Sequence, residues 1–193
     1  KSFAYKARYT GPFDDHGIPM LDYRGSIGKQ YNPIAVAQYG LGHYNLYKRT
    51  GEQEHRETFL RQANWLVEHL ELNPWGVPVW NHHFDWEYRD ILLAPWYMAL
   101  AQGAGISAVA RAYQETEEHR YIDTAEQAFQ AFRHDLKDGG VCYTDESQDV
   151  WLEEAIVDPP THILNGFIWA LWGVHDYFLL TGDSEARSLY GRC

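Results

Sequence analysis

Two short polar segments of this sequence contain residues that can move protons or bind an anion. Histidine, carboxylate, tyrosine and arginine side chains lie close together in residues 81–90, and several recur in residues 143–162. Such side chains serve as general acids and bases, and arginine binds carboxylates. The candidates are His82, His83, Asp85, Glu87, Tyr88, Arg89 and Asp90 in the first segment, and Tyr143, Asp145, Glu153, Glu154 and His162 in the second.

The adjacent residues Glu153 and Glu154 have the chemistry of a general acid and base pair. Neighbouring residues of a strand point to opposite faces, so at most one of the two side chains faces a cleft. A solvated surface pair is the alternative. Arg89 presents a similar choice, because it either clamps a substrate carboxylate or pairs with Glu87 or Asp90 on the surface.

The sequence contains no recognisable metal-binding pattern. The histidines of residues 81–85, NHHFD, match no firm metal-ligand spacing. The two cysteines, Cys142 and Cys193, make neither a zinc site nor a disulfide framework. We therefore expect no metal and no other cofactor.

Three long apolar segments, residues 32–51, 94–116 and 159–182, begin at or next to a proline. The prolines at 33, 95 and 159 are 62 and 64 residues apart, and proline suits the first turn of a helix. We predict three helices that are apolar on all sides. Each contains an amide shortly before a glycine, which either lines a cavity or satisfies backbone groups in the core. These amides are Gln38, Gln102 and Asn165.

Amphipathic segments alternate with the apolar ones. Apolar side chains recur at three- and four-residue steps in residues 53–71 and 119–136, and a third such segment starts at Ser184. An all-round apolar helix must be covered on both sides, an amphipathic one on one side only. A period of about 60 residues then predicts a mainly α-helical chain of stacked hairpins. We expect part of an α/α toroid, with the apolar helices inside.

Short β-hairpins are predicted to lead into the inner helices. Residues 76–80, GVPVW, resemble residues 140–144, GVCYT, and each segment precedes a tryptophan, Trp86 or Trp151. Inner helices of a toroid run parallel, so their N-termini form one mouth, where free N–H groups and helix dipoles favour an anion. We expect the two polar segments to meet there, with Tyr97 and Gln102 facing the ligand.

Composition limits the classes of function. A chain of 193 residues that is 45% hydrophobic and 16% aromatic suits one folded domain with a real core. A formal net charge of −11 argues against a general nucleic-acid-binding surface. No apolar run is long enough to predict a membrane span, and residues 1–17 do not resemble a signal peptide, so the compartment is left open.

We divide the chain into an irregular N-terminal extension, residues 1–30, and a toroid domain, residues 31–193, which we expect to be truncated at its C-terminus. A partial toroid leaves an inner surface uncovered. That surface predicts self-association into a homo-oligomer, or poor solubility.

Four blocks of the chain resemble the C-terminal helical domain of the D-glucuronyl C5-epimerases, which act on heparosan and heparan sulfate. The blocks are YNPIAVAQYGLGHY, APWYMALAQGAGISAVARAY, WLEEA with HILNGFIWALWGVHDY, and EARSLYGR, in the family's order over residues 31–192. The resemblance implies conversion of D-glucuronate to L-iduronate within a uronic-acid polysaccharide. The chemistry would be proton abstraction from C5 and reprotonation from the opposite face.

The resemblance also implies site residues. The second glutamate of the family's Glu-Glu-Tyr run falls on Glu154, while the tyrosine position is Ala155. This departure removes a proton-transfer or binding group, for which Tyr143 or His162 would have to substitute. Glu154, Tyr143 and His162 are thus the catalytic candidates. The substrate-binding candidates are His82, Tyr88, Arg89, Tyr97, Gln102, Glu153 and Asn165.

Two other classes of function compete with an epimerase. A polysaccharide lyase begins with the same proton abstraction and then cleaves the chain, whereas a glycoside hydrolase needs two carboxylates, for which Asp85 or Glu87 could pair with Glu154. A glycan-binding domain without catalysis is the third hypothesis. The net charge of −11 disfavours a strongly sulfated substrate for any of them.

Overall fold

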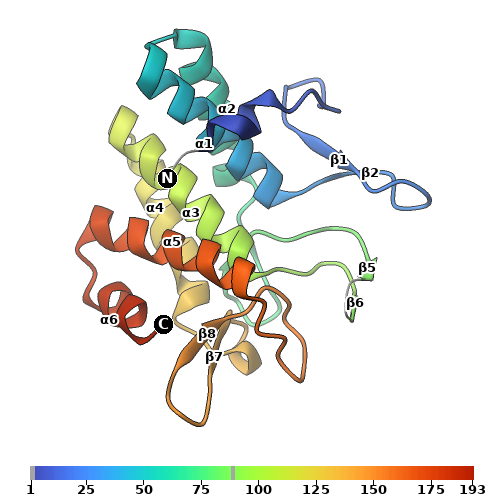
Figure 1. Ribbon diagram of the computed structural model, residues 1–193, viewed down its shortest axis with the longest axis vertical. Coiled ribbons are helices and arrows are strands. Elements are labelled where there is room, and N and C mark those ends of the chain that lie inside the picture. The colour runs from blue at the N-terminus through green and yellow to red at the C-terminus, as the bar shows by residue number, and fades with distance from the viewer. Residues whose placement is uncertain (1–2, 88–89) are drawn as a thin grey trace.

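The computed structural model describes residues 3–87 and 90–193. The described chain is mainly helical, and six α-helices form three consecutive hairpins (Figure 1). The helices are α1 (Pro33–Thr50), α2 (Gln53–Glu68), α3 (Ala99–Thr116), α4 (His119–Phe129), α5 (Leu164–Thr181) and α6 (Ser184–Arg192), with short 3-10 helices η1 (Ala4–Arg8), η2 (Gln130–Phe132) and η3 (Leu136–Asp138).

Four antiparallel strand pairs join or precede the helices. The pairs are β1 (Met20–Asp22) with β2 (Lys29–Tyr31), β3 (Glu71–Leu72) with β4 (Pro78–Val79), β5 (Trp86–Glu87) with β6 (Ile91–Leu92), and β7 (Cys142–Thr144) with β8 (Val150–Leu152). Figure 1 shows the N-terminal ends of α1, α3 and α5 directed towards the side of the molecule that carries β1–β2 and β5–β6. The pairs therefore lie near the ends of the helices and leave the helical core intact.

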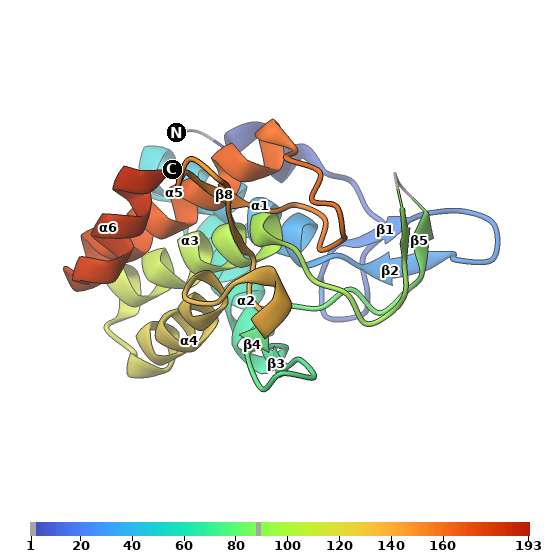
Figure 2. The same ribbon diagram turned by 90° about the horizontal axis from the view of Figure 1, so that it is seen from below.

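Helix α3 lies at the centre of the fold, with α1 and α5 on either side and α2 and α4 packed behind it (Figures 1 and 2). Every residue of α3 from 99 to 110 is buried, as predicted for a helix that is apolar on all sides. Gly103 of α3 allows close packing against α5, because a Cβ at this position would stand 2.6 Å from Cα of Ala170. The small residues of α3 thus set the helix spacing.

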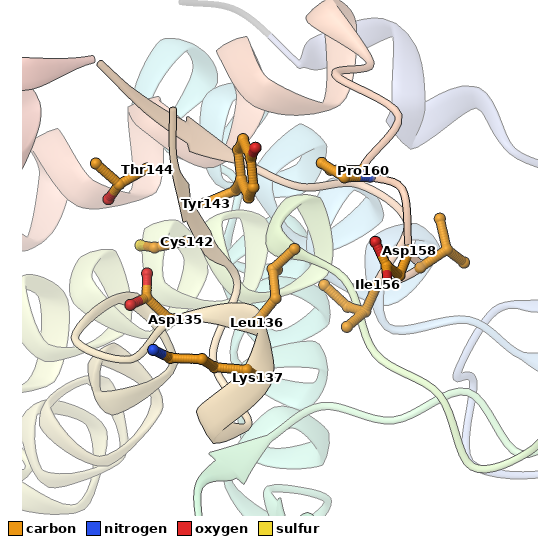
Figure 3. Close-up of a pocket in the computed structure, with 10 residues that line it drawn as sticks. Asp135, Leu136, Lys137, Cys142, Tyr143, Thr144, Ile156, Asp158 and Pro160 are labelled. Carbon is orange, nitrogen blue, oxygen red and sulfur yellow. The ribbon is translucent and has the colours of Figure 1, made fainter. Parts of the chain in front are cut away.

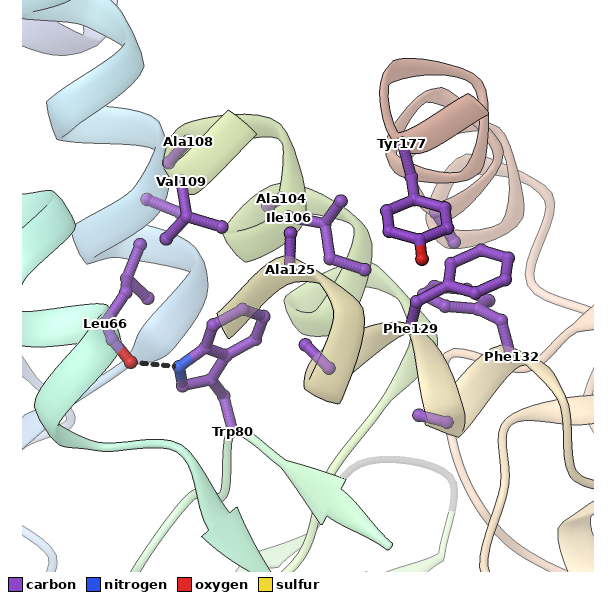
Figure 4. Close-up of a cluster of buried hydrophobic side chains, with 14 of the residues drawn as sticks. Leu66, Trp80, Ala104, Ile106, Ala108, Val109, Ala125, Phe129, Phe132 and Tyr177 are labelled. Carbon is purple, nitrogen blue, oxygen red and sulfur yellow. Dashed lines mark hydrogen bonds between the residues drawn. The ribbon is translucent and has the colours of Figure 1, made fainter. Parts of the chain in front are cut away.

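Aromatic side chains fill the space between α3 and the outer helices (Figure 4). Trp80 is fully buried, and its indole N–H donates to the carbonyl of Leu66 at 2.7 Å. Phe129 of α4 stacks on Tyr177 of α5 with ring centroids 4.1 Å apart. Amphipathic α2 buries Phe59 and Leu66 as predicted. The large aromatic content therefore supplies this core as well as the cavity described below.

Two of the three prolines do not open a helix, contrary to the prediction. Pro33 is the first residue of α1, where the Asn32 side chain accepts the Ile34 N–H at 2.9 Å. Pro95 and Pro159 precede α3 and α5 by several residues. The backbone around Pro95 is extended instead, because Trp96 exchanges two backbone hydrogen bonds with His82.

The hairpin prediction was correct for β7–β8 and wrong for residues 76–87. Strand β4 pairs with β3, which precedes it in the chain, and β5 pairs with β6, which follows it. The Asn73 side chain accepts the Trp75 and Val77 N–H groups and so closes the β3–β4 turn. The Asp85 side chain accepts the Ala94 N–H and so links the two segments at the open end of the β5–β6 pair.

The N-terminal extension is not irregular throughout. It contains η1 and β1–β2, and Phe3 and Ile18 join the main hydrophobic core. Helix η1 packs on α1 where Gly42 provides room, since a Cβ there would stand 2.7 Å from the Ala7 nitrogen. The division at residue 31 stays a prediction.

One face of α5 is exposed and apolar. Leu164, Ile168 and Trp172 follow at four-residue steps, with exposed fractions of 60%, 37% and 36%. Both the partial ring of hairpins and self-association through such a face stay predictions. Among the described residues, no helix has the length and hydropathy needed to cross a membrane.

Candidate functional site

The starts of the three central helices open onto one cavity of about 240 Å³. The residues that immediately precede α1, α3 and α5, namely Asn32, Met98 and Ile163, all line it. The predicted common mouth is therefore present. Neither Met98 nor Ile163 caps its helix with a side chain, so the first N–H groups of α3 and α5 depend on other partners.

The walls of this mouth cavity are largely aromatic. Tyr23, Phe84, Trp86 and Trp96 line it, and they come from three separate segments of the chain. The rings of Tyr23 and Phe84 lie 4.5 Å apart, and those of Tyr23 and Trp86 lie 5.0 Å apart. Apolar walls with a few polar groups are typical of small-molecule sites.

Glu154 is the acidic residue of the mouth cavity. Its carboxylate accepts the N–H of Gly166 in the first turn of α5, and the Asn165 amide lies 3.4 Å from Oε2. Glycine is needed at 166, because a Cβ there would approach the Glu154 Cβ to 2.6 Å. Burial raises the pKa of Glu154, with the Gly166 hydrogen bond acting in the opposite direction. A carboxyl group whose pKa is raised by burial in a cavity is a candidate for proton transfer.

Glu153 points away from this cavity, as expected for adjacent residues that follow a strand. Its side chain is fully buried and accepts the N–H groups of Thr161 at 3.2 Å and His162 at 3.1 Å. The other carboxylate oxygen lies 2.5 Å from His162 Nδ1. Its backbone carbonyl accepts the first N–H of α3, at Ala99. Glu153 thus holds together the loop before α5 and the start of α3.

Tyr143 and His162 do not line the mouth cavity. The His162 ring packs between Trp151 and Tyr143, with centroid distances of 4.6 and 5.3 Å. Tyr143 borders a different, more open cavity of about 550 Å³, together with Leu136, Ile156 and Pro160 (Figure 3). Their proposed catalytic role stays a prediction that this arrangement does not support.

His82 lines the mouth cavity and is fully buried. It stacks on Trp96 with centroids 3.9 Å apart, and Nδ1 faces the Trp96 carbonyl at 3.4 Å. Burial lowers the pKa of His82 to about 3, so the ring is neutral at pH 7. Nδ1 then carries the proton, and the buried Nε2, which has no partner within the described chain, is an acceptor.

Of the two roles that the sequence allows for Gln102, the structure shows the second: it satisfies backbone groups in the core. It is fully buried, its Oε1 accepts the Trp80 N–H at 3.0 Å, and its Nε2 donates to the carbonyls of Trp80 and Met98. Tyr97 is also buried, beside Asn73, and does not border the mouth cavity. Tyr88 and Arg89 lie outside the described residues. Among those described, no cluster of three or more His, Cys, Asp or Glu could hold a metal ion.

A family model described as "D-glucuronyl C5-epimerase C-terminus" matches residues 76–193. The chain belongs to this family. It is 33% identical over 126 residues to a D-glucuronyl C5-epimerase of Caenorhabditis elegans, covering 64% of this chain and 20% of that protein. An uncharacterized protein of Methanocaldococcus jannaschii is 25% identical over 202 residues, covering 93% of this chain and 65% of that protein.

A solved structure has a similar fold. It is a family 76 glycoside hydrolase from a bovine Bacteroides thetaiotaomicron strain, with a TM-score of 0.65 and 16% sequence identity over 97% of this chain and 38% of that one. At this identity the likeness concerns the fold alone. The chain spans one fifth of the nematode epimerase and under two thirds of the archaeal protein.

Within this epimerase-family domain, several cavity residues were missed by reasoning from the sequence. Tyr23 lies in the N-terminal extension, for which the sequence predicts no role, and Asn32 is predicted only to begin a helix. Phe84 and Trp86 were a visible signal, because two large rings within the polar segment 81–90 are unusual for a solvated loop, and Trp96 follows shortly after it. Ala155 also borders the cavity, so its small side chain leaves space there.

Proposed function

We propose that this chain is part of a uronate C5-epimerase that converts D-glucuronate to L-iduronate within a polysaccharide. One observation carries the proposal: a half-buried carboxyl group with a raised pKa, Glu154, lines an aromatic cavity at the starts of three helices. Membership of the epimerase family supports the same reading. No cofactor is needed for this chemistry.

Glu154 would act as the base. It removes the C5 proton, and the electron pair of the broken C–H bond moves into the neighbouring substrate carboxylate. The positive ends of the helix dipoles of α1, α3 and α5, which begin together at the mouth, favour the added negative charge there. Such proton transfer by a positioned group contributes about 10²–10⁴-fold to a rate.

The other cavity residues would bind the sugar. Trp96 and Trp86 offer flat apolar surfaces to the C–H face of the ring, and the unpartnered Nε2 of His82 would accept a hydrogen bond from a hydroxyl group. Asn165, beside Glu154, would orient the base. The net charge of −11 favours an unsulfated uronan over a highly sulfated one.

The hairpins would belong to an α/α toroid. Three of them, with α1, α3 and α5 side by side, would form one part of such a ring, and the exposed face of α5 would be covered by a further helix or by a second copy. Sedimentation of the purified chain distinguishes these cases, because a dimer through α5 would dissociate when Ile168 is replaced by glutamate.

The test is incubation of the full-length protein with heparosan in heavy water, read by NMR at C5. Deuterium at C5 in chains of unchanged length is the expected result. Chain cleavage with an unsaturated, ultraviolet-absorbing end would identify a lyase instead. Saturable binding of a series of uronans without deuterium incorporation would replace the enzyme by a glycan-binding domain.

A further inference from the structure

An epimerase needs a second proton-transfer group, because the proton returns to C5 on the face opposite to the base. Glu154 supplies one group. His82 is neutral at pH 7, because burial lowers its pKa to about 3, so it carries no imidazolium proton to donate. Among the described residues that line the mouth cavity, Tyr23 is the remaining side chain with an exchangeable proton of suitable chemistry. This reasoning rests on the proposed function.

The hydroxyl group of Tyr23 is arranged as a donor. The Asn32 amide donates to the Tyr23 oxygen at 2.7 Å, so the oxygen is the acceptor in that bond. No other hydrogen bond of this hydroxyl is formed within the described chain, and its own proton is therefore free for a ligand. Asn32 is itself held in place, because its Oδ1 caps α1 through the N–H groups of Ile34 and Ala35.

The ring of Tyr23 is also fixed from the sides. It packs on Phe84 and Trp86, which together with Tyr23 belong to the wall formed by β1–β2 and β5–β6. Glu154 comes from a different element, the segment between β8 and α5. Two proton-transfer groups from separate elements can therefore contact one sugar ring bound in the mouth cavity.

We propose that Tyr23 is the second catalytic residue, which donates its phenolic proton to C5 after Glu154 has removed the original one. A C5–H bond breaks as Glu154 gains the proton, and a new C5–H bond forms as the Tyr23 O–H bond breaks. The electron pair held by the substrate carboxylate returns to C5. The Asn32 amide stabilises the resulting phenolate, and exchange with solvent restores both groups.

Tyr23 also accounts for the space beside Ala155. Both residues line the mouth cavity, so a phenol that reaches in from the β1–β2 hairpin would serve where the 155 position has no functional group. Of the candidates from the sequence, Tyr143 borders a different cavity and His162 packs against Trp151 and Tyr143. Among these three residues, only Tyr23 shares the cavity with Glu154.

The test compares two rates in the full-length protein: conversion of one C5 epimer to the other, and exchange of the C5 proton with solvent deuterium. Tyr23→Phe keeps the ring against Phe84 and Trp86 and removes only the proton donor. We expect it to lower conversion of one epimer to the other at least 100-fold, while Glu154 still exchanges the C5 proton of one epimer with deuterium on the same face. Asn32→Asp retains the helix cap but loses the donor to the phenol, and should lower conversion less.

The control is Tyr9→Phe. Tyr9 donates its hydroxyl proton to the Met20 carbonyl of the same hairpin, at 2.5 Å, and does not border the mouth cavity. It should leave conversion within about twofold of the wild type. Equal loss of exchange and inversion in Tyr23→Phe, or full activity, would overturn the role of Tyr23 alone. Absence of exchange in the wild type with every uronan would overturn the proposed function, and this inference with it.

Discussion

The buried carboxylate of Glu153 lies 2.5 Å from Nδ1 of His162 and accepts two backbone N–H groups from the same turn. His162 has φ of 49°, a left-handed conformation that is uncommon for a residue with a Cβ. Glu153 therefore stabilises an unfavourable turn. Since Glu154 follows directly in the chain, this contact also fixes the direction in which the neighbouring carboxylate points.

Replacing Glu153 with Gln should destabilise the protein. The amide can accept fewer of these hydrogen bonds, so we expect a loss of about 1–3 kcal/mol in the free energy of unfolding. Urea denaturation measures it. The matched control is Glu146→Gln, at an exposed position, which should change the free energy by less than about 0.5 kcal/mol. Equal effects of the two substitutions would show that the buried contact contributes nothing.

Glu154→Gln should separate activity from stability. Conversion should fall about 10²–10⁴-fold, because the base is lost. The folded state raises the pKa of Glu154, so it disfavours the charged form, and its contribution to stability is lost as pH rises through that pKa. The variant should therefore be as stable as the wild type at pH 7, or more stable. A lower melting temperature would indicate that the carboxylate serves mainly as a structural cap of α5.

The pH dependence of activity provides a separate check on Glu154. A base must be deprotonated to act, and burial raises its pKa above the ordinary value of 4.5. The acidic limb of kcat/KM should therefore have its midpoint above pH 4.5. A midpoint below that value would contradict the assignment of Glu154 as the base.

Stability should fall between pH 6.5 and pH 4. Burial lowers the pKa of His82 to about 3 and that of His43 to about 4, so the unfolded chain binds protons first as the pH drops. His82 alone should lower the free energy of unfolding at pH 5, relative to pH 7, by on the order of 1–2 kcal/mol. Urea unfolding at pH 7 and pH 5 measures it. His82→Phe should reduce the difference, whereas exposed His16→Gln should leave it unchanged.

Gly103→Ala should weaken the contact between α3 and α5. The added Cβ would stand 2.6 Å from the Ala170 backbone, and such overpacking costs about 1–3 kcal/mol. Gly191 lies in α6, where a Cβ meets no atom within 4 Å. Gly191→Ala should stabilise the protein by about 0.5–1 kcal/mol through helix propensity. Thermal melting tests both variants: Gly103→Ala should lower the melting temperature and Gly191→Ala should raise it.

The sequence alone determined the order of the helical hairpins and the family. Hydrophobic periodicity distinguishes α3, which is covered on all sides, from α2, which has one buried face, and this distinction is local. The pairing of residues 140–152 into a hairpin was also predictable. The same pattern failed at residues 76–87. The Asn73 side chain closes the β3–β4 turn and the Asp85 side chain binds the Ala94 N–H beyond β6, and strand propensity reveals neither contact.

Only the tertiary structure decided which polar residues meet. Gln102 was equally suited to a cavity and to the core, and its burial against Trp80 settled the choice. Tyr23 and Glu154 are 131 positions apart, and their shared cavity arises because α1, α3 and α5 begin on the same side. Periodicity reports which face of a helix is buried. It does not report which distant loops cover the helix ends, and in this protein those loops form the candidate site.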